Sequence, residues 1–420
     1  FYPFAGGLRA PRKPMGGYAG LRPQPGRAVP PPLMIRAGPP QRPRGARAGK
    51  VSHLKSCRKV DPVTYAAITG WGKCLPPAVL TNDDLATFLD TTDEWITTRT
   101  GIRERRISHV PLAEMAYVAA MRALAAAGLD PGEIELIIVG STSYDDQVPN
   151  QASGLQARLG AKRAASMDVN TGCTSFLYSS STANAFIRTG VARNALVIGG
   201  ELISAFLDWQ NRGTCVLFGD GCAAVVLQAT DREEGLLAER LGCDSDGRDT
   251  LVVEGMGGRY VNKGRIYGDT AWTFEGQEIF KRAVISMAGA RADVLEAPPP
   301  PPHDAGLVLP PPPHPRLIEA VAKRAGVPME RVFVNVQRYG NMSAGTVPVA
   351  LVEALEEGRV QPGSLLLMPA FGAGLTWCAH LVRWGDRVTP KGTTDVELPP
   401  CDKTALELVH DMIRAKGKLA

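Results

Sequence analysis

The sequence predicts an α/β protein built from two similar halves of about 160 residues each. Short apolar runs typical of strands buried on both faces, such as 134–140, alternate with segments whose apolar residues recur at helical spacing, such as 115–127. The same alternation restarts after a Gly- and Asp-rich stretch at 242–267, which indicates an internal duplication. We therefore expect a mostly parallel sheet covered by helices, with a site where strand ends meet.

Apolar periodicity, capping residues and turn residues define the elements of the first half. Strands are expected at 65–72, 134–140, 164–169, 195–200, 215–218 and 222–228, the last two joined by a tight turn at 219–221. Helices are expected at 115–127, 151–159 and 176–187, with further helix starts after the capping segments 81–84 and 93–96.

The second half follows the same scheme. Helices are expected at 277–295, 316–325 and 346–357, and strands at 306–309, 332–336, 364–369 and 375–384. The predicted organisation is a disordered basic extension rich in Pro and Gly (1–60), an N-terminal half (61–233), a C-terminal half (234–386) and a tail (387–420) with one helix at 403–416.

Composition narrows the class of protein. The chain has 420 residues and a formal net charge of +5, but residues 1–59 carry much of the basic excess and the remainder is near balance, so a nucleic-acid-binding face is not supported. No apolar run approaches the roughly 20 residues of a membrane span. The eight cysteines lack metal-ligand spacing and indicate a reducing compartment. We expect a cytoplasmic protein without a metal, or an organellar one if residues 1–60 are a transit peptide.

One cysteine lies at the junction of a predicted strand and a predicted helix. Cys173 should be at or near the first turn of the helix at 176–187. Backbone N–H groups without partners and the positive end of the helix dipole lower a thiol pKa at such a position, which favours a nucleophilic thiolate. The alternative is a thiol that serves only as core, because free cysteines are among the most buried residues.

Several further segments accompany the cysteine in a fixed order. They are T-D-E-W-I at 92–96, R-T-G-I-R-E-R at 99–105, R-G-T at 212–214, F-G-D-G at 218–221, Y-G-N-M-S-A at 339–344 and F-G-A-G-L-T-W at 371–377. Together with Cys173 they resemble the β-ketoacyl-acyl carrier protein synthase III family of the thiolase superfamily, over roughly residues 64 to 386. The resemblance implies a thiolase-like fold, with two duplicated α/β halves in α-β-α-β-α layers, and a homodimer.

The resemblance also implies a condensing enzyme. Cys173 would take an acyl group from acyl-coenzyme A, a substrate and not a bound cofactor, and a carbanion from the decarboxylation of malonyl-acyl carrier protein would attack that acyl group. Asn341 falls on the family's Asn, which stabilises the enolate, and the backbone N–H groups of Cys173 and Ala373 would form the other oxyanion hole. An ordinary turn residue is the alternative for Asn341.

The catalytic histidine of the family has no match here. Counting back from Arg316 places Pro311 at its position, and proline has neither a side-chain donor nor an ionisable group. His314 is the nearest candidate for a catalytic histidine, although a lone His is more often structural. Two alternatives to initiation of fatty acid synthesis stay open: an acyltransferase of the same fold that does not decarboxylate, and an impaired homologue.

The resemblance places a coenzyme A site at Trp95 and Arg99. The aromatic ring would stack on the adenine and the guanidinium would pair with phosphate. A Trp packed in a helix seam beside a surface Arg is the alternative. A further arginine of this site in some family members aligns with Ala205, which suggests weaker affinity.

Three other positions match the family near its channel. Lys281 and Arg316 would lie at the mouth, where the acidic carrier protein approaches, unless they are ordinary solvated charges. Val148 matches a residue that one subunit contributes to the acyl pocket of its partner, where a side chain smaller than Phe leaves room for longer or branched acyl groups.

Overall fold

The computed structural model describes residues 65–257, 270–295, 306–309, 315–324 and 326–416, with the side chains of 291, 292, 315 and 316 left undescribed. The predicted extension at 1–60 therefore lies outside the described residues. Within the described ranges, no helix combines the length and the apolar character needed to cross a bilayer.

The first sheet has five strands and is mixed. Its strands lie side by side in the order β1 (Tyr65–Cys74), β7 (Gly221–Thr230), β6 (Asn194–Glu201), β4 (Leu136–Gly140) and β5 (Ala165–Val169). The strands β4, β5 and β6 run parallel, whereas β7 is antiparallel to both β1 and β6. Since β1 and β6 are each antiparallel to β7, they point the same way, so four of the five strands are parallel and β7 is the exception to the expected mostly parallel sheet.

The second sheet has four strands, in the order β11 (Leu307–Val308), β12 (Leu365–Gly372), β13 (Thr376–Arg383) and β8 (Gly235–Cys243). Only β11 and β12 are parallel. The predicted strand at 332–336 is not formed: Val332 makes a single bridge to Val308, and the chain then turns into the short helix α8 (Val336–Tyr339). Its apolar residues are buried against this sheet without joining the ladder.

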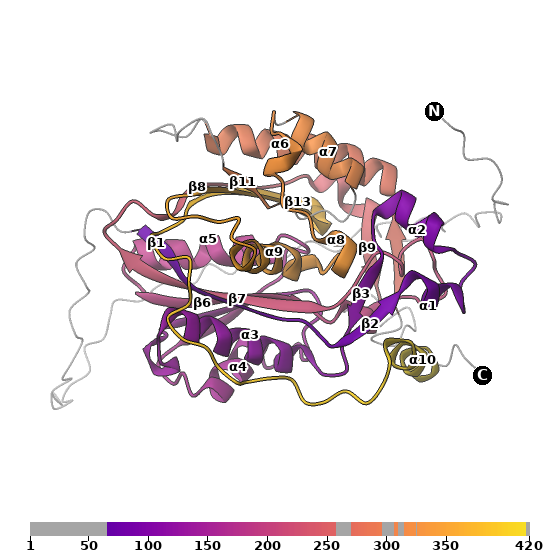
Figure 1. Cartoon of the computed structure of the whole chain (residues 1–420), viewed down its shortest axis with the longest axis horizontal. Coiled ribbons are helices and arrows are strands. Elements are labelled where there is room, and N and C mark those ends of the chain that lie inside the picture. The colour runs from indigo at the N-terminus through magenta and orange to yellow at the C-terminus, as the bar shows by residue number, and fades with distance from the viewer. Residues whose placement is uncertain (1–64, 258–269, 296–305, 310–314, 325, 417–420) are drawn as a thin grey trace, which may run out of the picture. The chain divides into compact units, whose positions relative to one another are not determined.

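Helices separate and cover the two sheets, which gives the expected α-β-α-β-α layers (Figure 1). The outer helices on the first sheet are α3 (Leu112–Ala127) and α4 (Gln151–Leu159), the central ones are α5 (Ser175–Arg188) and α9 (Thr346–Glu356), and those on the second sheet are α6 (Gly276–Leu295) and α7 (Pro315–Arg324). The central helix α9 is buried at every residue except its last, because it packs between both sheets. This architecture confirms the thiolase-like fold.

Smaller elements lie at one end of the layers. They are β2 (Ala78–Thr81), β3 (Glu104–Ile107), α1 (Asn82–Ala86), α2 (Asp93–Thr100), β9 (Leu251–Glu254) and β10 (Ala271–Phe274). The predicted strand at 215–218 is a run of turns in this region, and its backbone bonds go elsewhere: Leu217 O accepts from the N–H of Asn341 at 2.8 Å.

The C-terminal tail crosses from the second sheet to these smaller elements. Its extended part lies along α3, where the N–H of Lys391 donates to Ala126 O at 3.0 Å, and ends at Pro399, whose carbonyl is 2.8 Å from His109 Nε2. Its helix α10 (Ala405–Ala415) begins with a capping box from Thr404 and buries one face in the cluster that includes β2 and β3.

Candidate active site

Cys173 lies on the turn between β5 and α5, at the carboxyl end of a parallel strand. The helix begins at Ser175, with Thr174 as its N-cap, so the cysteine precedes the first turn instead of lying in it. Hydrogen bonds within the turn fix its shape: the N–H of Thr171 donates to Ser175 Oγ at 2.9 Å, and that hydroxyl donates to Gly172 O at 2.7 Å. The thiol is therefore held on a rigid turn between two regular elements.

The prediction of a lowered thiol pKa is wrong. Burial raises the pKa of Cys173, and the negative charge of Glu201 raises it further. Hydrogen bonds from Ser343 and Asn341 and from the cysteine's own N–H act in the opposite direction but do not cancel the effect of burial. The resting side chain is a neutral thiol at neutral pH, so it must lose a proton before it attacks.

Two loops, one from each half, meet backbone to backbone at the cysteine. A Cβ added to Gly372 would lie 2.6 Å from Cys173 N, and one added to Gly172, whose φ is +65°, would lie 2.7 Å from Ala373 N. Because only glycine fits at both contacts, the N–H groups of Cys173 and Ala373 lie at this junction. Among the described residues Ser343 alone combines a side chain with positive φ, so the alanine at 373 is unstrained.

Asn341 is buried and its amide is oriented by its neighbours. Its Oδ1 accepts from the N–H of Ser343 at 2.8 Å and from Thr346 Oγ1 at 3.3 Å. Its backbone is fixed by the N–H of Gly219, which donates to Asn341 O at 3.1 Å. The amide oxygen is thus occupied, and the NH₂ group is the donor directed to the thiol of Cys173. An ordinary turn residue would not need this arrangement.

Sequence reasoning missed Ser343, which lies in the segment 339–344, and Glu201, which directly follows the strand predicted at 195–200. Ser343 has a φ of +47°, and its Oγ donates to Glu201 Oε1 at 3.0 Å. Glu201 is the last residue of β6 and is fully buried, and burial raises its pKa. One signal in the sequence could have found Glu201. A carboxylate directly after an apolar strand, with no Lys or Arg close to it in the sequence, is unusual.

Trp95 on α2 is contacted by two arginines. The guanidinium carbon of Arg99 is 4.5 Å from the centre of the indole ring and that of Arg212 is 5.1 Å from it. Ala205, at the position where some family members have a further arginine, lies in the turn after β6, so the weaker affinity expected from its small side chain stays a prediction. Arg212 belongs to the R-G-T segment, which was recognised in the sequence but given no role.

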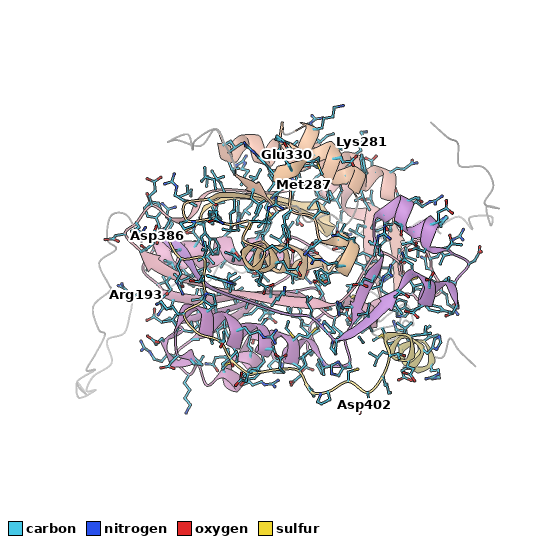
Figure 2. The ribbon with its side chains drawn as sticks, viewed as in Figure 1. Arg193, Lys281, Met287, Glu330, Asp386 and Asp402 are labelled. Atoms are coloured by element: carbon cyan, nitrogen blue, oxygen red, sulfur yellow. The ribbon has the colours of Figure 1, made fainter. Side chains whose placement is uncertain are left out.

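The remaining predicted residues lie apart from the cysteine or outside the described part. Lys281 is exposed on the outer surface of α6 (Figure 2), and Arg316 is in α7, with its side chain undescribed. Val148 is 89% exposed in the single chain. Pro311 and His314 lie outside the described residues.

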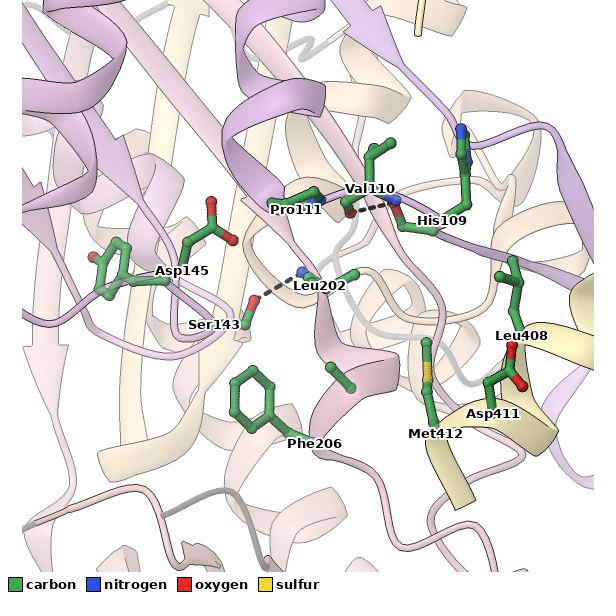
Figure 3. Close-up of a pocket in the computed structure, with 13 residues that line it drawn as sticks. His109, Val110, Pro111, Ser143, Asp145, Leu202, Phe206, Leu408, Asp411 and Met412 are labelled. Carbon is green, nitrogen blue, oxygen red and sulfur yellow. Dashed lines mark hydrogen bonds between the residues drawn. The ribbon is translucent and has the colours of Figure 1, made fainter. Parts of the chain in front are cut away.

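A cavity of about 540 Å³ is lined in part by Ser143 and Leu202 (Figure 3). Its lining comes from four places: the segment 108–111, the segment after β4, the turn after β6, and α10 through Leu408, Asp411 and Met412. Neither Cys173 nor Asn341 lines it. Ser143 is the link to the site, since it lines the cavity and donates to Glu201. In the described part of the chain no group of His, Cys, Asp or Glu could hold a metal ion.

Comparisons with known proteins give a consistent result. Residues 167–245 match the family model described as 3-oxoacyl-[acyl-carrier-protein (ACP)] synthase III, and residues 295–384 match the model of its C-terminal part. The chain is 50% identical over 349 residues to beta-ketoacyl-[acyl-carrier-protein] synthase III 2 of Vibrio cholerae serotype O1, which covers 83% of this chain and 96% of that relative. It is 44% identical over 330 residues to beta-ketoacyl-[acyl-carrier-protein] synthase III of Roseiflexus castenholzii, covering 76% and 98%.

A solved structure extends the likeness to three dimensions. The crystal structure of 3-oxoacyl-[acyl-carrier-protein] synthase III from Aquifex aeolicus VF5 superposes with a TM-score of 0.71 at 42% identity, and covers 76% of this chain and all of that one.

Proposed function

Because the chain belongs to the β-ketoacyl-[acyl-carrier-protein] synthase III family, we propose that it joins an acyl group from acyl-coenzyme A to malonyl-acyl carrier protein and so starts fatty acid synthesis. The single observation that carries this proposal is the meeting of Cys173 with the amide of Asn341, at a junction that also holds the N–H groups of Cys173 and Ala373. The names of the relatives do not favour the non-decarboxylating or impaired alternatives.

The first half of the reaction acylates the cysteine. The deprotonated sulfur of Cys173 attacks the thioester carbon, negative charge develops on the thioester oxygen, and the bond from that carbon to the coenzyme A sulfur then breaks. The N–H groups of Cys173 and Ala373 would donate to that oxygen, which their position at the junction of the two loops supports, and such donors typically contribute about 3 kcal/mol to the transition state. Trp95, Arg99 and Arg212 support binding of the nucleotide end of coenzyme A, through an aromatic face and two guanidinium groups.

The second half forms the carbon–carbon bond. Loss of carbon dioxide from the malonyl group puts negative charge on its thioester oxygen, and the NH₂ group of Asn341 is the donor available to that enolate. The carbanion attacks the acyl carbon on Cys173, and the sulfur leaves. The family has a second donor, a histidine, at the position that Pro311 occupies here. Pro311 and His314 both lie outside the described residues, so a catalytic role for His314 stays a prediction.

We further propose a homodimer that docks an acidic carrier protein. The strand β5 pairs with β4 on one side only and is therefore an open edge of the first sheet. Val148 lies exposed in the loop after β4, as a residue offered to a partner would. Lys281 on α6 supplies positive charge for the carrier.

The test follows the acyl group by intact-protein mass spectrometry. Incubation with acetyl-coenzyme A should add one acetyl group to the wild type, and malonyl-acyl carrier protein should then remove it with release of carbon dioxide. Cys173→Ala should lose the adduct and at least about 10⁴-fold of the turnover. Cys401→Ser, which changes a partly exposed thiol in the tail, should keep both. An adduct that is discharged without carbon dioxide would contradict the proposal.

A further inference from the structure

Glu201 is a buried carboxylate with many donors and no cation. Its two oxygens accept hydrogen bonds from the backbone N–H groups of Thr142 and Ser143 and from the hydroxyls of Ser141, Thr142, Ser143 and Ser343. No Lys, Arg or His among the described residues forms an ion pair with it. A buried carboxylate is costly without a cation, and burial makes it ready to accept a proton.

Ser343 connects this carboxylate to the nucleophile. Its hydroxyl donates to Glu201 Oε1 at 3.0 Å, and hydrogen bonding with the same side chain is one of the causes that lower the pKa of the Cys173 thiol. Its lone pairs are therefore free to accept the thiol proton. The positive φ of Ser343 costs about 1–3 kcal/mol for a residue other than glycine, and such strain is concentrated at functional sites.

We propose that Ser343 and Glu201 relay the proton of Cys173 during acylation, a step that rests on the function proposed above. The thiol proton passes to Ser343 Oγ while the original hydroxyl proton passes to Glu201 Oε1, so that negative charge moves from the carboxylate to the sulfur. The sulfur then bonds to the acyl carbon, and the bond from that carbon to the coenzyme A sulfur breaks. The proton returns from Glu201 through Ser343 to the coenzyme A thiolate, which leaves as a thiol.

The relay explains how a neutral, buried thiol is activated. While Glu201 is charged it opposes ionisation of Cys173, and this opposition disappears once Glu201 accepts the proton. The other titratable groups that face Glu201 are Asp220, Cys222 and Tyr144. Asp220 is held by Ser108 and Ser204, and Tyr144 donates to Val139 O. None of these four hydrogen bonds connects Asp220 or Tyr144 to Cys173.

The decisive variant is Glu201→Gln, because the two possible roles of the carboxylate predict opposite changes in the rate of Cys173 acylation. The readout is the rate of Cys173 acylation by saturating acetyl-coenzyme A in a single turnover, over a pH range of about 5 to 9. If the relay operates, the variant should be acylated about 10²-fold more slowly with an unchanged KM. The rise of its acylation rate with pH should also begin at a higher pH than in the wild type. A carboxylate that acts only as a nearby charge predicts the reverse, since its removal lowers the thiol pKa and speeds acylation at a given pH.

A second variant keeps the proposal testable if Glu201→Gln does not fold. Ser343→Ala leaves the carboxylate in place and removes the link, so acylation should slow by a similar factor, and the double variant should be no slower than either single one. Ser181→Ala is the matched control, since it removes an equally buried hydroxyl that contacts His380 instead. Unchanged acylation in Ser343→Ala would overturn the relay. A wild type that is never acylated would instead contradict the proposed function.

Discussion

Two buried glutamates of the same core, Glu201 and Glu353, are held in opposite ways. Glu353 on α9 receives Lys73 Nζ at 3.2 Å and Arg338 Nη2 at 2.9 Å, and it also accepts from Asn335 and Tyr339. Glu201, at the end of β6, has only hydroxyl and N–H donors. The two carboxylates are equally hidden from solvent, at 3% and 0% exposure, so burial alone does not distinguish their roles.

The difference lies in how each burial is compensated. Burial would raise the pKa of Glu353, but hydrogen bonds from Tyr339 and Asn335 and the charges of Lys73 and Arg338 lower it below the ordinary value. Burial raises the pKa of Glu201, and its hydrogen bonds do not reverse that shift. A carboxylate with cations is fixed in its charged form and stabilises the fold, whereas one without cations can change its protonation state beside the nucleophile.

The largest effect on stability is expected for Glu353→Gln. This change removes the buried charge that Lys73 and Arg338 share and leaves them only the more exposed Glu356 and Glu357, so the free energy of unfolding should fall by about 2–4 kcal/mol in a denaturant titration. Cys173 acylation per folded molecule should stay within about twofold of wild type. Glu356→Gln, which alters an exposed partner of the same Lys73, should cost less than about 0.5 kcal/mol. Acylation as slow as in Glu201→Gln would remove the distinction between the two glutamates.

Asp220 sharpens the comparison, because it too is buried without a cation. Burial raises its pKa to about 6 from an ordinary 3.8. Because this pKa is raised in the folded state, protonated Asp220 stabilises the fold below about pH 4, and this stabilisation is lost as the pH rises to about 6. At about 1.4 kcal/mol per pKa unit, the loss is roughly 3 kcal/mol. Asp220→Asn should remove this dependence, measured as the free energy of unfolding at several pH values. If wild type and variant show the same slope between these pH values, Asp220 does not titrate there.

The smallest expected effect is the coupling between Lys73 and Glu353. Lys73 is partly exposed, so Lys73→Met should cost about 0.5–1 kcal/mol, and the double variant with Glu353→Gln should be less destabilised than the sum of the two single variants. Additive losses would show that this cation does not compensate the buried charge, and would leave Arg338 as the partner that matters.

Cys173 and Asn341 could be predicted from the sequence, whereas the residues that surround them, Ser343 and Glu201, could not. Cys173 and Asn341 lie in segments with recognisable spacing, and each lies beside a turn that its own neighbours create. Ser343 and Glu201 come together through the packing of β6 against the loop after α8, a long-range contact that no local pattern contains. The thiol pKa was mispredicted for the same reason, since dipoles are local to a helix but burial depends on the whole core.

Helix and strand positions followed periodicity closely, with α4 at its predicted bounds. The segments 215–218 and 332–336 did not form the predicted strands, because apolar residues are needed for burial whether or not the backbone joins a ladder.

The route of the tail has a practical consequence for anyone who shortens the chain to the length of its shorter relatives. Residues 385–416 cross α3 and end in a helix whose buried face is formed by Ala405, Val409 and Ile413. Removing them uncovers apolar side chains around β2 and β3 and frees the carbonyls that Arg387 and Lys391 now engage. A truncated protein should therefore aggregate during expression, whereas a purification tag placed after residue 420 leaves this helix intact.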